Sequence, residues 1–268
     1  MPAMFVGETR FPRDFRRYAR QFSLLEIDCE PGSVPGKARL QACAEQAPEG
    51  FVFSLVVPSN LASLEAGEAA ERAWKAAQNV ARILKAKWWV VRTPTAVRPT
   101  RRAREQLGSL FSRLSAGGMR VAWEPRGLWE DDAAGEAAAA LGAYLVQDVA
   151  KLDPLPADAL YARVLALARG ARVGLGLAER IAERIHAFPE AFVAVEGSGA
   201  RAIQAALGLV QDAEPSESES DADESEDADE LEDSDESDDA DDESDDDDDE
   251  SDDESDDDDD ESDEIEEA

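Results

Sequence analysis

The chain has 268 residues and a formal net charge of −35, from 62 acidic and 27 basic residues, with one histidine and two cysteines. No apolar stretch approaches the roughly 18 residues of a membrane span, one histidine excludes a site of several imidazoles, and cysteines without CxxC spacing are expected to be reduced. Because the first seven residues lack a basic region followed by an apolar one, we expect a cytoplasmic protein without membrane association.

The charge is distributed very unevenly along the chain. The last basic residue is Arg201, and 39 of the acidic residues lie within 211–268, which leaves 23 acidic against 27 basic residues upstream. We therefore predict a globular domain over 1–210 and an Asp/Glu/Ser tail over 211–268. The tail is expected to be disordered, because its like charges repel and almost no apolar surface is available to offset chain entropy.

Three roles for the acidic tail remain open. It could keep the protein soluble by self-repulsion, engage basic proteins as a mimic of the nucleic-acid backbone, or lie across the basic domain as an autoinhibitor. Its own charge opposes direct binding of nucleic acid. Ten serines stand among the acids, and composition alone does not establish their phosphorylation.

Within 1–210, short apolar segments alternate with Ala/Arg/Glu-rich helical ones, which is typical of repeated βα units. In chain order, strands are expected at 5–8, 24–28, 51–58, 88–93, 120–125, 143–149, 160–166 and 192–197. Helices are expected near 12–22, 36–47, 66–86, 99–116, 131–141, 176–187 and 199–210, with a loop at 151–156. Eight strands in this alternation predict an α/β fold, a compact TIM-barrel-like (β/α)8 barrel, with an open doubly wound sheet as the alternative.

No glycine-rich phosphate loop follows any expected strand, which excludes the usual nucleotide-binding site. In a barrel, chemistry gathers at the carboxyl ends of the strands. Polar residues recur at those ends: Glu8, Glu26, Asp28, Arg92, Glu124, Arg126, Asp148 and Glu196. Alternation along a strand places Glu26 with Asp28 on one face, and Glu124 with Arg126 on another.

Two interpretations of these residues stay open. In the functional one, Glu26, Glu124 and Arg126 are catalytic candidates for acid/base work on a small polar substrate, and a ligand contacts Asp28, Arg92, Trp129, Asp148 and Glu196. Its metal variant uses the carboxylates of Glu26, Asp28, Glu124 and Asp148 to hold Mg²⁺ or Mn²⁺. In the structural interpretation the same side chains form ion pairs, such as Glu124 with Arg92 or Arg126. Motifs for nucleophilic catalysis are absent.

Aromatic and basic clusters complete the set of candidates. Trp88 and Trp89 face opposite sides of the fourth expected strand, so both are predicted to pack in the core. Trp129 is the better candidate for a ring at the barrel mouth. A basic cluster at 98–104 opens a helix, where it could dock phosphates or the tail, or form a solvated face.

Several segments resemble the YecE-like family, also called domain of unknown function 72. Tyr18-Ala-Arg-Gln-Phe-Ser-Leu-Leu-Glu26-Ile-Asp28 is similar to its "YA..F..VEIN" segment, and Ala47-Pro-Glu-Gly-Phe51-Val-Phe-Ser to its "tP.gF.F.vK" strand. Val90-Val-Arg92-Thr-Pro94 stands at its "FQLPP" position. Arg120-Val-Ala-Trp-Glu124-Pro-Arg126-Gly-Leu-Trp129 resembles "vavEfRh.sW", which is the most specific match. The resemblance covers most of 1–210 and implies a TIM-barrel-like fold.

Other family positions differ in this chain. The "RlHG" strand end is missing, and Tyr161-Ala-Arg163-Val-Leu is its nearest counterpart, while Val195-Glu196-Gly197-Ser198 replaces the terminal "FNN". The resemblance carries over Glu26, Glu124 and Arg126, and it implies no established reaction. We therefore predict a non-catalytic or weakly active binding or regulatory scaffold, whose tail engages basic partners or maintains solubility. The alternative is a small-substrate enzyme with a carboxylate site at the barrel mouth, in one version with Mg²⁺ or Mn²⁺ as its cofactor.

Overall fold

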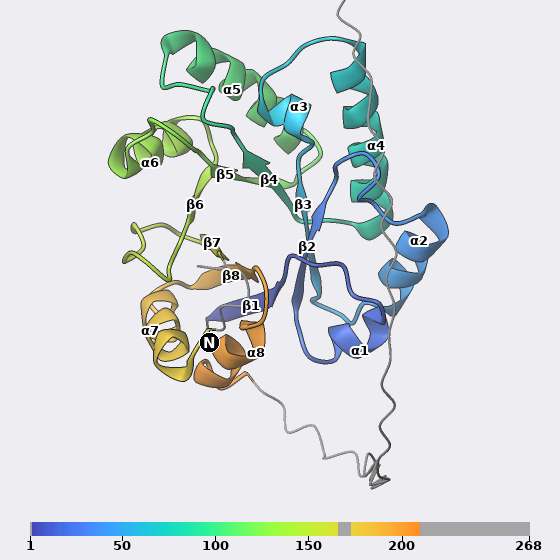
Figure 1. Ribbon diagram of the computed structural model, residues 1–268, viewed down its shortest axis with the longest axis vertical. Helices are drawn as coiled ribbons and strands as arrows, with labels where there is room; N and C mark the ends of the chain where they lie inside the picture. The colour runs from blue at the N-terminus through green and yellow to red at the C-terminus, as the bar shows by residue number, and fades with distance from the viewer. Residues whose placement is uncertain (1, 166–172, 210–268) are drawn as a thin grey trace, which may run out of the picture. The chain divides into compact units, whose positions relative to one another are not determined.

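The computed structural model describes residues 2–165 and 173–209 and contains a closed barrel of eight parallel strands (Figure 1). The strands are β1 (Ala3–Glu8), β2 (Leu24–Asp28), β3 (Val52–Val56), β4 (Trp88–Arg92), β5 (Arg120–Glu124), β6 (Tyr144–Gln147), β7 (Leu160–Val164) and β8 (Glu190–Val195). Each pairs with its neighbours in chain order, and β1 closes the ring by pairing along its whole length with β8. The predicted barrel is confirmed, and the open doubly wound alternative is wrong.

Helices connect most of the strands in the manner of a (β/α)8 barrel. They are α1 (Phe15–Ala19), α2 (Lys37–Gln46), α3 (Ser59–Ala62), α4 (Glu68–Leu84), α5 (Arg101–Ser115), α6 (Asp131–Ala140), α7 (Leu175–Ile185) and α8 (Ala200–Ala206). The segment between β6 and β7 contains no helix, as expected. The short α3 was not predicted. Helix α1 is shorter than the expected 12–22, because Asp14 caps its start and the chain turns at Arg20 and Gln21 before β2.

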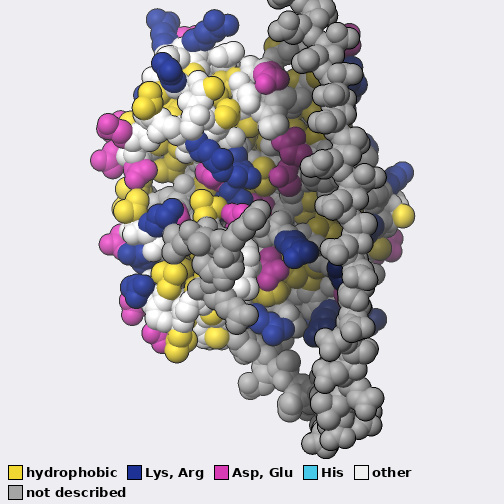
Figure 2. All heavy atoms as spheres, viewed as in Figure 1, with side chains coloured by type: hydrophobic (Ala, Val, Ile, Leu, Met, Phe, Trp, Pro, Cys, Tyr) yellow, Lys and Arg dark blue, Asp and Glu magenta, His cyan; other side chains and the backbone are white. Residues whose placement is uncertain are grey.

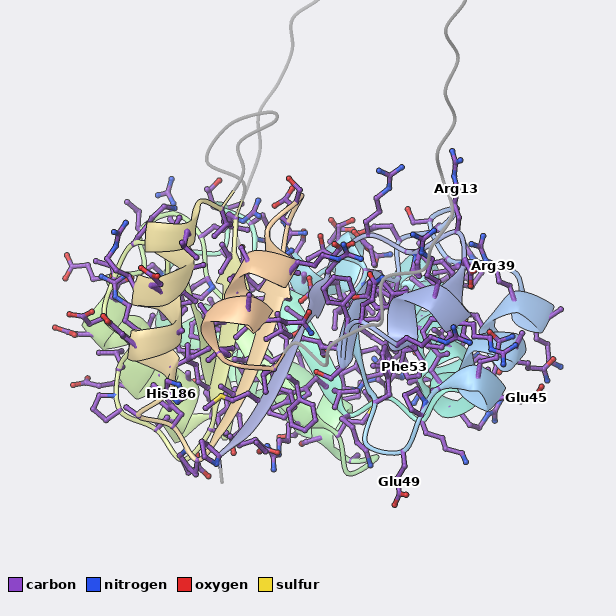
Figure 3. All side chains as sticks on the ribbon, turned by 90° about the horizontal axis from the view of Figure 1, so that it is seen from below. Arg13, Arg39, Glu45, Glu49, Phe53 and His186 are labelled. Carbon is purple, nitrogen blue, oxygen red and sulfur yellow. The ribbon has the colours of Figure 1, made fainter. Side chains whose placement is uncertain are left out.

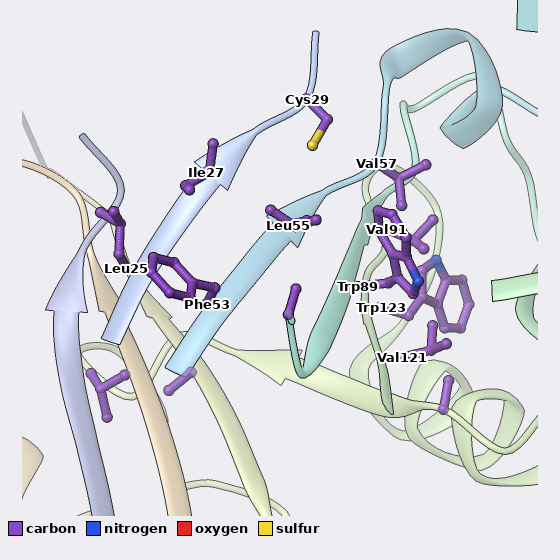
Figure 4. Close-up of a cluster of buried hydrophobic side chains, with 14 of the residues drawn as sticks. Leu25, Ile27, Cys29, Phe53, Leu55, Val57, Trp89, Val91, Val121 and Trp123 are labelled. Carbon is purple, nitrogen blue, oxygen red and sulfur yellow. The ribbon is translucent and has the colours of Figure 1, made fainter. Parts of the chain in front are cut away.

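Two hydrophobic layers follow from the alternation of side chains along the strands. Outward-facing residues such as Leu25, Leu55 and Trp89 pack between the strands and the helices, and Figure 4 shows this row along β2, β3 and β4. Inward-facing residues fill the barrel around Trp88, whose ring contacts those of Tyr144, Tyr161 and Phe192. Trp88 and Trp89 are both buried on opposite faces of β4, as predicted.

The two ends of the strands define two ends of the barrel. In Figure 3, Arg13 in the segment after β1 and Glu49 in the turn before β3 lie at opposite edges of the body. Near the first of these ends, the Tyr18 hydroxyl accepts a hydrogen bond from Glu8 N (2.7 Å) and donates one to Leu24 O (2.6 Å). This tyrosine, part of the segment that resembles the family, therefore ties α1 to the start of β2 and the end of β1.

Other expectations concern single residues and the tail. Cys29 and Cys43 are free and buried, and His186 is an exposed residue at the end of α7 (Figure 3). No helix in the described part of the chain is long and apolar enough to cross a membrane. The prediction of a disordered tail at 211–268 falls outside the described residues.

Candidate functional site

A polar cluster lies inside the barrel at the carboxyl ends of four strands. It consists of Glu26 from β2, Arg92 from β4, Glu124 from β5 with Arg126 just after it, and Tyr161 with Arg163 from β7; we call these six residues the mouth network. All four strands are parallel, so their carboxyl ends meet at one opening. On the face shown in Figure 2, Lys and Arg side chains lie beside Asp and Glu side chains near the centre.

Glu26 is the most deeply placed acid of the mouth network, with 1% of its surface exposed. One carboxylate oxygen accepts a hydrogen bond from the Tyr161 hydroxyl at 2.8 Å, and the other accepts from Arg163 Nε at 3.0 Å. Burial raises the pKa of Glu26 above its usual value, while the Arg163 charge and the Tyr161 hydrogen bond act in the opposite direction. Both oxygens of this buried acid are therefore engaged within the protein.

Arg163 joins the two acids of the network. Its Nε donates to Glu26, and its terminal nitrogen Nη1 donates to Glu124 Oε2 at 2.5 Å. Desolvation alone would lower the pKa of Arg163, but Glu26 and Glu124 together raise it above its usual value. The planar guanidinium suits such a bridge, because its donors point in fixed directions toward separate carboxylates.

Glu124 extends the network toward solvent. Its carboxylate lies 3.5 Å from Arg92 Nε and 3.3 Å from an Arg126 guanidinium nitrogen, which confirms the predicted ion pairs. The Glu124 side chain is 13% exposed, against 30% for Arg92 and 47% for Arg126. The three guanidinium groups outnumber the two carboxylates, so the outer part of the mouth carries a positive balance.

The remaining predicted site residues have other surroundings. Asp28 accepts a hydrogen bond from Glu30 N, and Asp148 accepts from Ala150 N and pairs with Lys151 at 2.8 Å. Glu196 is exposed after β8. The Trp129 indole donates to Val97 O at 2.8 Å and packs edge-on against Trp123, which belongs to the outer layer. The structure thus brings Glu26, Glu124, Arg92 and Arg126 together. The other four predicted residues, Asp28, Asp148, Glu196 and Trp129, lie outside the mouth network.

The arrangement does not fit a divalent cation. Within residues 2–165 and 173–209, no group of three or more His, Cys, Asp or Glu side chains is placed to hold a metal ion. The proposed metal set of Glu26, Asp28, Glu124 and Asp148 is split, and the first and third of these already face guanidinium groups. A hard cation needs several oxygen ligands and is disfavoured beside fixed positive charges.

Sequence reasoning missed the two residues that complete the network on β7. Tyr161 and Arg163 appeared only as the counterpart of a family strand end. Alternation on β7 places them on the same face, so an arginine two positions after a tyrosine inside an apolar strand was the available signal. Their contact with Glu26 crosses the barrel interior between strands that are not neighbours.

Comparison with known proteins identifies the family. The sequence matches the family described as "Protein of unknown function DUF72" over residues 4–228, which is most of the chain. The protein therefore belongs to the DUF72 family, as the motifs around Glu26 and Glu124 suggested. No curated protein matches the sequence.

Solved structures of the family have a similar fold. A DUF72 family protein from Enterococcus faecalis V583 is 17% identical, with a TM-score of 0.59 over 78% of this chain and 99% of that one. A DUF72 family protein from Thermotoga maritima MSB8 is 16% identical, with a TM-score of 0.53 over 77% of this chain and 97% of that one. A D-tagatose 3-epimerase-like protein matches at 13% identity with a TM-score of 0.48. At these identities the likeness to the two DUF72 structures shows the fold alone.

Proposed function

We propose that this DUF72 barrel is a non-catalytic binding or regulatory scaffold, and that its acidic segment engages basic partner proteins. One observation carries the first part: both oxygens of Glu26 accept hydrogen bonds from Tyr161 and Arg163 inside the barrel. A catalytic acid or base must reach a proton of the substrate. Because Glu26 is also only 1% exposed, a substrate could reach it only if the side chains that cover it moved.

The alternative of a small-substrate enzyme has one specific observation in its favour. Burial raises the pKa of Glu26 above its usual value, as is common for catalytic acids, and Arg92 and Arg126 are open enough to hold an anionic substrate group. Structural ion-pair networks also shift pKa values, however. Glu26 is buried, and Arg163 donates hydrogen bonds to both acids of the network. These two observations favour the scaffold over the enzyme.

The second part of the proposal rests on charge. Residues 211–268 contain 39 acidic residues and no basic one. Such a segment attracts basic proteins over a distance set by the ionic strength, about 10 Å at 0.1 M salt.

A binding experiment with a small basic protein, cytochrome c, tests the acidic segment. We expect the full chain to capture it at low salt and release it at about 0.5 M salt, and a chain ending at Gln211 to capture none. Circular dichroism melting checks that the shorter chain is folded. Equal capture by both chains would place the binding surface in the barrel and contradict this part of the proposal.

Thermal melting in millimolar Mn²⁺ separates the scaffold from a metal enzyme. We expect the full chain and its Glu26→Gln variant to respond equally, because the mouth network offers no vacant carboxylate. The acidic segment is identical in both proteins, so its own cation binding cancels in the comparison. Stabilisation of the full chain that Glu26→Gln abolishes would support the metal site instead.

A further inference from the structure

A hollow lies at the opposite end of the barrel from the mouth network. It has a volume of about 810 Å³ and is bounded by the second half of α4, the turn into β4, and the end of α5 with the loop into β5. These segments lead into the strands, so the hollow belongs to their amino ends. We call it the α4–α5 groove. Its volume lies within the range of about 300–1,000 Å³ that is usual for ligand sites.

The groove is lined by cations. Five basic side chains contribute to it: Lys75, Arg82, Lys85, Lys87 and Arg113. No Asp or Glu is among its lining residues, although the chain has 62 acidic residues in all. The amides of Gln78 and Asn79 and the Gly117-Gly118 turn add to the wall, together with apolar residues such as Trp74, Trp89 and Met119. Such a lining has a strong preference for negative charge.

Most of this charge is not neutralised by the protein. Arg113 forms a two-point ion pair with Glu71, at 2.8 and 2.7 Å, and lies over the Trp74 ring. Within the described residues, the other four cations form no ion pair with a carboxylate. Placing four like charges around one hollow is unfavourable unless solvent or a ligand screens them.

Helix electrostatics accounts for only part of the cluster. The carboxyl end of a helix favours cations, which explains Arg82 and Lys85 at the end of α4. It does not explain Lys87 just before β4, and Lys75 lies one turn after Glu71, whose pKa is lowered by Arg113 and to a smaller extent by Lys75. Lys75 and Lys87 come from different segments and converge on the same hollow.

Lys85 itself occupies a position that normally belongs to glycine. It caps α4 in the left-handed region, with φ of 51° and ψ of 44°. Glycine is the usual residue there because a side chain is strained in this conformation. A lysine at this strained position adds a charge to the groove, and no ion pair within the described residues accounts for it.

We infer that the α4–α5 groove binds a compact ligand with several phosphate groups. Each phosphate carries up to two negative charges and three strong acceptor oxygens, so a short polyphosphate concentrates enough charge to meet the four cations without a carboxylate ion pair within this volume. Lysines bind phosphate as point charges, and the amides of Gln78 and Asn79 can donate to bridging oxygens. This site is separate from the mouth network and does not depend on the proposed scaffold role.

Calorimetric titration of the full chain with inorganic tripolyphosphate at about 50 mM salt tests the inference. We expect saturable binding that weakens at least about tenfold in the variant Arg82→Gln/Lys85→Gln/Lys87→Gln. The matched control is Arg98→Gln/Arg101→Gln/Arg102→Gln, which removes the same charge from exposed arginines at the other end of α5. It should bind within about twofold of the full chain.

A second variant keeps the test independent of folding. Lys85→Gly removes one groove charge while relieving the backbone, so it should weaken binding without lowering the melting temperature. Equal weakening by the groove and control variants would show general charge attraction and overturn the inference. Absence of binding, or citrate binding as tightly as tripolyphosphate, would overturn it as well.

Discussion

At the scale of single residues, the mouth network balances burial against charge. Glu26 and Arg163 are both nearly inaccessible, and a buried pair contributes little net stability because each ion loses its hydration. Removal of one partner is costly, since the other charge is left in a medium of low polarity. A single substitution in the network is therefore expected to lower stability more than a double substitution that removes both charges of a pair.

The variant Arg163→Met is expected to lose about 3 kcal/mol of stability at neutral pH, because it strands Glu26. The pKa of Glu26 is already raised by burial and should rise further without the arginine. The native variant would then hold a proton that the unfolded chain has released, so its stability falls as pH rises through this window. Urea unfolding at about pH 5 and pH 8 measures this, with a smaller deficit expected at the lower pH.

The surface pair Glu68–Arg72 provides the control for this effect. Its side chains are 94% and 72% exposed, so Arg72→Met should change stability by less than about 0.5 kcal/mol at either pH. A deficit for Arg163→Met that is as small as this, or that grows on acidification, would contradict the proposed burial of a charged Glu26.

At the scale of elements, the eight strands were predictable because parallel barrel strands are apolar on both faces. The limits of the strand Leu24–Asp28 were predicted correctly, and the other strands begin and end within two residues of their predicted limits. The four-residue α3 follows Pro58 without any apolar period, so sequence could not separate it from a loop. Alternation also paired Glu124 with Arg126 correctly, since that relation is local to one strand end.

The left-handed backbone of Lys85 at the carboxyl end of α4 leads to a prediction about stability. Lys85→Gly should raise stability by about 1 kcal/mol, because it removes the strain of a side chain in the left-handed region. Lys75→Gly is the matched control in the same helix and should lower stability by about 1 kcal/mol. Urea unfolding of both variants checks the difference in sign. Loss of stability in both would show that the backbone at Lys85 is unstrained.

At the scale of the whole molecule, ion pairs lie at both ends of the barrel interior. Arg120 pairs with Glu190 at the amino ends of the strands and lies over the Trp88 ring, opposite the mouth network. The contact between Arg163 and Glu26 could not be predicted from sequence, because it spans the interior between β7 and β2. It exists only once β1 and β8 have closed the ring.

The charge difference along the chain also belongs to this scale. Residues before 211 carry a small positive balance, while those after carry only negative charge. The division was visible in the sequence because formal charge does not depend on folding. The convergence of Lys75, Lys87 and Arg113 on one groove was not visible, since it requires the packing of α4 beside the end of α5.

The internal engagement of Glu26 is tested most directly by a double-mutant cycle on the full chain. The free energy of urea unfolding is measured for the unaltered protein, Glu26→Gln, Arg163→Met and the double variant. We predict a coupling of at least about 2 kcal/mol, with the double variant more stable than Arg163→Met alone. Additive losses would contradict the account, since they would mean that Glu26 and Arg163 do not hold one another inside the barrel.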